Sequence, residues 1–191
     1  MFLAIEAWIV SDSDDDTAGD DGSDTPLQTG TVDGVTAPDR LTFEEIAVGD
    51  RFEADRSVTF SRESIVEFAA EYDPQPFHLE EAAGTASPFG GLVASGLHSF
   101  CVCSRLSTEA FFGRVAFLGG RGIDDLRWHQ PVRPGDSLSV DVVVATKRPS
   151  DSDPERGYVD ADVTGSDPDG DPAVSWRVLG MIRRDPTAGS D

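Results

Sequence analysis

Lysine is nearly absent from this sequence: Lys147 is the one lysine, so 14 of its 15 basic residues are arginines. Acidic residues number 36, which gives a formal net charge of −21. Nucleic-acid binding requires clustered cations that neutralise phosphates, so this charge opposes that class of function. An acidic, lysine-poor surface fits a protein adapted to a high-salt cytoplasm, where screening weakens self-repulsion, and an ordinary acidic protein is the alternative.

Cysteine and long hydrophobic runs are also scarce. The two cysteines, Cys101 and Cys103, would point to different faces of a helix and could not form a disulfide, which fits a reducing cytoplasm. The apolar opening MFLAIEAWIV spans only ten residues and contains Glu6, so it is too short to cross a bilayer and is a poor signal peptide. We therefore expect a cytoplasmic protein without a membrane segment.

Metal and phosphate motifs are missing as well. No Cys/His cluster has the spacing of metal ligands, and there is no glycine-rich phosphate loop, so we expect no metal and no bound cofactor. The stretch DPDGDP from Asp167 begins like a calcium loop, but Val178 occupies the position that requires Glu. This stretch is predicted to be a hairpin turn.

The chain divides into a polar tail and one domain. Residues 11–38 are mostly Asp, Gly, Ser and Thr, which cannot bury enough apolar surface to offset the entropy of ordering. We therefore predict a disordered acidic tail over residues 1–40, a folded domain over residues 41–185 and a flexible C-terminus over residues 186–191.

Hydrophobic periodicity predicts an α+β domain. Alternation predicts strands over 51–60, 122–132, 137–147, 158–164 and 173–183. A helix is predicted over 62–72, capped by Ser61 and ended by the Asp73–Pro74 step. The segment 92–112 is apolar almost all round at its start, which predicts a longer, buried helix. No helix separates the later strands, so we expect an antiparallel sheet folded around that helix.

The stretch EYDPQPFHLE places a carboxylate and an imidazole in a stiff loop. Asp73 and His78 flank two prolines, Pro74 and Pro76. Such a pair can perform general acid–base chemistry on a shared water near neutral pH. The alternative is structural: Asp73 would cap a turn and His78 would fill a local hydrogen bond.

Three blocks of the sequence, which include these residues, resemble a known family. The pattern Asp-x-x-Pro-x-His, followed by FGGLVASGLHS and GGRGIDDLRWHQPVRPGDSLSV, resembles the MaoC-like dehydratases and R-specific enoyl-CoA hydratases from about Leu41 to Arg184. The resemblance implies a hot-dog fold and the reversible addition of water to a trans-2-enoyl thioester, with Asp73 and His78 as the catalytic pair. Gln75 stands where the best-known hydratases carry Asn.

Further site residues lie at the start of the buried helix. If Ser95 caps it, Gly96 offers an unpaired N–H near the positive end of the helix dipole, and the resemblance makes this amide the oxyanion donor. A glycine needed only for close packing is the alternative, and both roles can hold together. His98 is a candidate pocket residue or a core histidine, while Cys101 is a candidate acyl-pocket residue or a small buried side chain. With Gln75 and Ser95, they are the predicted substrate-binding residues.

The sequence thus predicts a hydratase or dehydratase acting on an acyl-CoA thioester. A hot-dog thioesterase is one alternative, although its carboxylate usually lies on the long helix, where this chain offers only Glu109. A non-catalytic acyl-thioester-binding subunit is the other. Unpaired sheet edges and a thinly covered helix flank favour a homodimer or a higher homo-oligomer.

Overall fold

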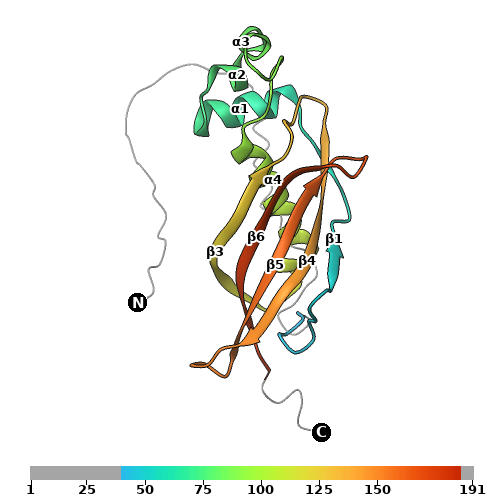
Figure 1. The fold of residues 1–191 in the computed structure, drawn as a ribbon, viewed down its shortest axis with the longest axis vertical. Helices are drawn as coiled ribbons and strands as arrows, with labels where there is room; N and C mark the ends of the chain where they lie inside the picture. Colours follow the sequence, from blue (N-terminus) through green and yellow to red (C-terminus); the bar gives the residue numbers. More distant parts are fainter. Residues whose placement is uncertain (1–39, 186–191) are drawn as a thin grey trace, which may run out of the picture. The chain divides into compact units, whose positions relative to one another are not determined.

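A computed structural model describes residues 40–185 of the chain. The predicted tail, apart from Arg40, and the predicted flexible C-terminus lie outside the described residues. Within residues 40–185, the predicted α+β architecture is confirmed: a six-stranded antiparallel sheet packs against one long helix (Figure 1).

Four long strands form most of the sheet. They are β3 (Phe117–Trp128), β4 (Ser137–Pro149), β5 (Arg156–Ser166) and β6 (Pro172–Arg183). The strand order is β1-β4-β5-β6-β3, so β3 is an edge strand. The alternating pattern of β4 places its apolar side chains on the buried face of the sheet, as expected: Leu138, Val140, Val142 and Val144 are all buried. The DPDGDP stretch connects β5 to β6 as a turn, as predicted.

The N-terminal strand is shorter than predicted. The sequence indicated one strand over 51–60, whereas the structure has β1 (Arg51–Glu53) and β2 (Val58–Thr59), both paired with β4. The chain leaves the ladder between them, where the Arg56 guanidinium donates to both carboxylate oxygens of Glu109, at 2.9 and 2.7 Å.

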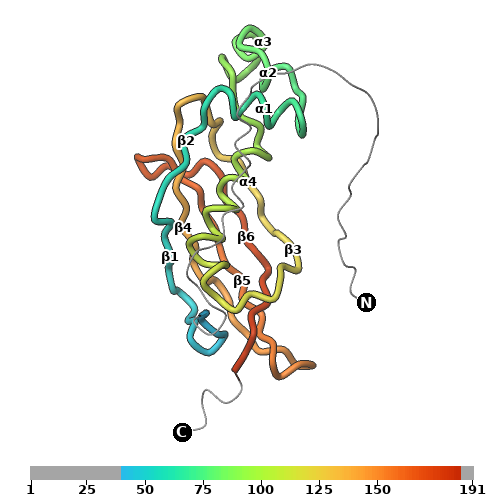
Figure 2. The backbone as a smooth tube through the Cα atoms, turned by 180° about the vertical axis from the view of Figure 1, so that it is seen from behind, coloured from blue at the N-terminus to red at the C-terminus, as the bar shows by residue number. Residues whose placement is uncertain are grey.

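Helix α4 (Gly96–Ser107) lies against the concave side of the sheet and continues into a π-helical turn, Thr108–Phe112 (Figure 2). Cys103 and Leu106 are fully buried against the sheet. Burial is less complete than predicted, because Leu97, Cys101 and Arg105 form an exposed flank at i, i+4 and i+8. In a single chain, this one flank of α4 therefore faces solvent.

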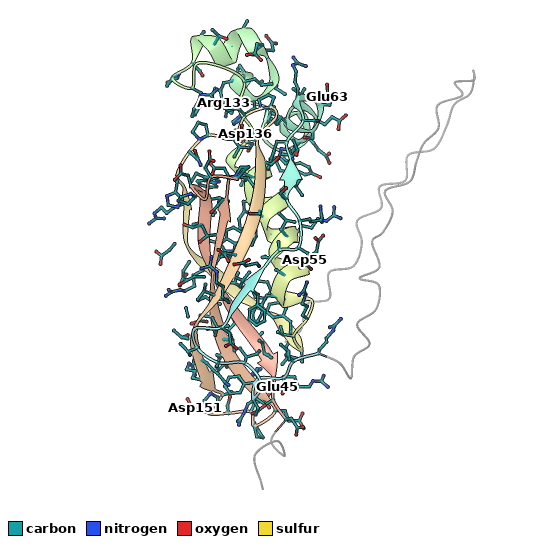
Figure 3. All side chains as sticks on the ribbon, turned by 90° about the vertical axis from the view of Figure 1, so that its right-hand side faces the viewer. Glu45, Asp55, Glu63, Arg133, Asp136 and Asp151 are labelled. Carbon is teal, nitrogen blue, oxygen red and sulfur yellow. The ribbon has the colours of Figure 1, made fainter. Side chains whose placement is uncertain are left out.

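Three helices gather at one end of the sheet, beside the start of α4 (Figure 1). They are α1 (Arg62–Tyr72), α2 (Pro76–Leu79) and α3 (Glu81–Ala86). Ser61 caps α1 as predicted, since its side chain accepts a hydrogen bond from Ser64 N–H. The loop from Arg133 to Asp136 lies next to these helices (Figure 3). Arg133 Nη2 donates to the Phe89 carbonyl at 2.5 Å and so ties this loop to the segment after α3.

Candidate active site

Asp73 and His78 are brought together by the stiff loop between α1 and α2. Helix α1 ends at Asp73, whose N–H still donates to Ala69 O at 3.0 Å. Pro76 opens α2, where its fixed φ suits the first helical position and its missing N–H costs nothing. His78 follows within this short helix, and its Nε2 lies 3.5 Å from Asp73 Oδ2.

His78 is held from its other ring nitrogen. Its side chain is 8% exposed, and Nδ1 lies 2.7 Å from the carbonyl oxygen of Val93. Because a carbonyl oxygen only accepts, Nδ1 carries a proton. The nitrogen that faces Asp73 and can exchange protons is therefore Nε2.

The start of α4 completes the polar centre. Ser95 Oγ donates to Asp73 Oδ2 at 2.6 Å and accepts from Leu97 N–H at 3.2 Å, so it caps the helix as predicted. Gly96 N–H has no hydrogen-bond partner among residues 40–185. Free first-turn amides and the helix dipole favour negative charge at this position. A carboxylate, an imidazole and a free first-turn amide thus share one site.

These groups line a cavity of about 490 Å³. Asp73, His78, Ser95 and Gly96 are in its wall, together with other residues from α2, from the segments on either side of the start of α4 and from the end of β3: Phe77, Phe89, Val93, Ala94, Leu97, Trp128, His129, Gln130 and Pro131. The apolar members give the cavity room for a carbon chain beside its polar centre.

The end of β3 and the residue after it add two side chains that no sequence motif indicated. His129 lines the cavity, with Nε2 2.8 Å from Ser175 Oγ. Trp128 also lines the cavity, and its Nε1–H donates to Gly96 O at 2.8 Å. These two residues lie about 30 positions after Gly96, so only the return of β3 to the start of α4 reveals them.

The other predicted substrate-binding residues lie outside this cavity. His98 is 8% exposed and stacks on Phe68, with ring centroids 4.6 Å apart and an interplanar angle of 7°. Its burial lowers its pKa. Gln75 is exposed at the start of α2, and Cys101 is exposed on α4 rather than buried. In a single chain, none of the three contributes to the cavity wall.

No group of three or more His, Cys, Asp or Glu side chains within residues 40–185 is arranged to hold a metal ion. No helix of this described part is long and apolar enough to span a bilayer.

An antiparallel sheet around a central helix, with a polar cavity at the N-terminus of that helix, defines a hot-dog protein. The family model of the MaoC like domain matches residues 43–165, and the chain belongs to this family. The crystal structure of the MaoC-like dehydratase from Rhodospirillum rubrum is similar to it: the sequences are 36% identical, the TM-score is 0.70, and the match covers 76% of this chain and 99% of that one.

Two sequence relatives differ in how far they match. Protein YdeM of Bacillus subtilis (strain 168) is 29% identical over 109 residues, which cover 57% of this chain and 77% of YdeM. The mesaconyl-CoA hydratase of Haloarcula marismortui is 42% identical over 69 residues, but these cover 35% of this chain and only 19% of the hydratase. The family and its hydratase relatives support a hydratase or dehydratase role without specifying the substrate.

Proposed function

We propose that this protein is an enoyl-CoA hydratase, or in reverse a 3-hydroxyacyl-CoA dehydratase, that uses Asp73 and His78 for acid–base catalysis. The observation that carries this proposal is the distance of 3.5 Å between Asp73 Oδ2 and His78 Nε2, in a cavity whose wall also includes Gly96. The proposed reaction requires an acyl-CoA thioester as substrate and no metal or redox cofactor.

The geometry supports a reaction in which the pair passes protons between water and substrate. Asp73 takes a proton from water as the hydroxyl adds to the β-carbon of the enoyl group. That proton passes from Asp73 to Nε2 of His78, which delivers it to the α-carbon, while Nδ1 keeps its own proton on the Val93 carbonyl, so the pair returns to its starting state. Negative charge develops on the thioester oxygen meanwhile, and the Gly96 N–H stabilises it.

A thioesterase is disfavoured by the position of the helix carboxylate. Glu109 lies beyond the far end of α4, where Arg56 and Arg105 bind it at 2.7–3.1 Å. It lines no part of the cavity. A carboxylate that is so engaged, and so distant along the helix, is a poor candidate for activating water beside the Gly96 amide.

One assay separates the candidate functions. A short trans-2-enoyl-CoA is incubated with the protein in multimolar salt, and both the conjugated absorbance and free thiol are followed. A hydratase removes the absorbance without releasing thiol, which is the result we expect. Thiol release would indicate a thioesterase, and substrate binding without either change would indicate a non-catalytic subunit.

We further propose that the protein works as a homodimer formed through β3. This edge strand exposes Leu118, Ile123 and Trp128, at 46%, 47% and 49%. A long edge strand that also exposes large apolar side chains invites pairing with another strand, and a second copy would also cover the open flank of α4. Sedimentation in high salt should therefore give a dimer, and Ile123→Arg should shift it toward monomer. A wild-type protein that sediments as an active monomer would contradict this proposal.

A further inference from the structure

Trp128 makes an unusual contact with the first turn of α4. Its indole Nε1–H donates to the Gly96 carbonyl at 2.8 Å, and Ser99 Oγ donates to the same oxygen at 3.0 Å. The ring also occupies the space that a side chain at position 96 would need, because a Cβ on Gly96 would lie 2.7 Å from two ring atoms of Trp128. The absence of a side chain at Gly96 thus allows Trp128 to reach the helix backbone.

A chain of hydrogen bonds continues from this contact to the proposed catalytic carboxylate. The Gly96 carbonyl and the Leu97 N–H belong to one peptide group. Leu97 N–H donates to Ser95 Oγ at 3.2 Å, and Ser95 Oγ donates to Asp73 Oδ2 at 2.6 Å. Every donor in the series points toward Asp73, and hydrogen bonds aligned in this way polarise and strengthen one another.

We infer that Trp128 is a positioning residue for Asp73, acting through the Gly96–Leu97 peptide and Ser95. Its role is to fix the orientation of that peptide. The one hydroxyl proton of Ser95 then stays directed at the carboxylate of Asp73. This role rests on the proposed function, since its kinetic consequence requires Asp73 to be the base.

The chain can be tested without any activity. Indole N–H signals of ¹⁵N-tryptophan-labelled protein are few, because the sequence has three tryptophans, and Trp128→Phe assigns the signal of interest. Trp128 is 49% exposed in a single chain, and its indole proton should exchange with solvent at least about tenfold more slowly than a free indole, both in the wild type and in the monomeric Ile123→Arg variant. Ser95→Ala should move this signal, although it changes a group two hydrogen bonds away. Free exchange, or a signal unmoved by Ser95→Ala, would overturn the inference.

Steady-state kinetics then distinguish a positioning role of Trp128 from a role as part of the cavity wall alone. Trp128→Phe keeps an aromatic wall but removes the donor, so kcat should fall about tenfold while KM stays within about twofold. On a Ser95→Ala background the same change should cost little further, because the chain is already broken. Trp176→Phe is the matched control: Trp176 is 3% exposed, packs on Phe100 and belongs to no part of the chain.

The outcomes distinguish this inference from the proposed function. An active wild type in which Trp128→Phe raises only KM, or in which the Ser95 and Trp128 losses simply multiply, would contradict the positioning role. A wild-type protein without hydratase activity would instead contradict the proposed function. In that case the exchange rate of the Trp128 indole proton, and the shift of its signal in Ser95→Ala, would still test the hydrogen-bonded link between Trp128 and Ser95.

Discussion

The two ends of α4 carry cavities of nearly equal size but of opposite character. The cavity at the N-terminal end, about 490 Å³, contains Asp73, His78 and the Gly96 amide. The cavity at the C-terminal end, about 510 Å³, has no ionisable side chain in its wall, which consists of Ser104, Ser107, Thr108, Phe112, Phe117, Gly120, Gly122, Ile123, Trp176 and Val178. One helix therefore has a cavity with ionisable side chains at one end and a cavity without them at the other.

The difference comes from the segments that return to each end. At the N-terminal end, the proline-stiffened loop and the end of β3 bring polar groups against free helix amides. At the C-terminal end, the charges point away from the cavity: Glu109 is bound by Arg56 and Arg105, and the hydrogen bond from Arg56 is the largest influence that lowers its pKa. A cavity in this fold thus becomes reactive through its neighbouring loops rather than through its volume.

Replacing one carboxylate at each end of α4 should give the largest difference in kcat between the two ends. Asp73→Asn keeps the shape of the site but cannot accept a proton from water, so kcat should fall at least about 100-fold. Glu109→Gln is the matched control and should leave kcat within about twofold, because an exposed ion pair contributes only about 0–1 kcal/mol. Both variants should be assayed for enoyl-CoA hydration in the same salt. Equal losses in the two variants would remove the distinction between the ends.

Replacing a closely packed glycine by alanine should have a smaller effect on kcat, and this effect should again differ between the two ends of α4. In Gly96→Ala the new Cβ would press on the Trp128 ring, 2.7 Å away, so we expect kcat to fall about tenfold as the proposed oxyanion amide shifts.

Gly165→Ala is the counterpart, because its Cβ would lie 2.5 Å from Cys103 Sγ on the buried face of α4. This overpacking should lower the free energy of unfolding by about 1–3 kcal/mol while kcat of the folded enzyme stays near the wild-type value. Thermal melting and turnover measured on both variants check the contrast. A Gly96→Ala protein that only melts earlier would leave Gly96 with a packing role alone.

The smallest expected effect concerns pH and His98, in the first turn of α4. Burial between Phe60 and Phe68 lowers its pKa from the ordinary 6.5, and Nδ1 has no partner within the described residues. The unfolded chain therefore binds this proton first as the pH falls. The stability associated with neutral His98 is complete above about pH 6.5 and is lost as the pH drops toward the lowered pKa.

The melting temperature should accordingly fall by a few degrees more in the wild type than in His98→Phe between about pH 7 and about pH 5. His129→Phe is the control, since His129 is exposed. Parallel pH profiles for wild type and His98→Phe would show that His98 does not carry this dependence.

The sequence was sufficient for the features that depend on local patterns. Strict alternation located β4 to β6, and Ser61 and Ser95 located the starts of α1 and α4. The Asp73–His78 pair was predictable because its two members are five residues apart. Trp128 and His129 were not, because their places in the cavity wall depend on the long-range pairing of β3 with β6, which no local pattern encodes. The break between β1 and β2 was not predicted either.

The most direct test of the account is the double variant Asp73→Asn/His78→Ala, measured beside the two single variants. When two residues act as one unit, removing either of them already removes their joint contribution to catalysis. Each single change should therefore lower kcat at least about 100-fold, and the double variant should lose little more. All three proteins must melt near the wild-type temperature for the comparison to count. Folded single variants that hydrate enoyl-CoA at nearly the wild-type rate, or losses that multiply in the double variant, would contradict a shared catalytic role for this pair.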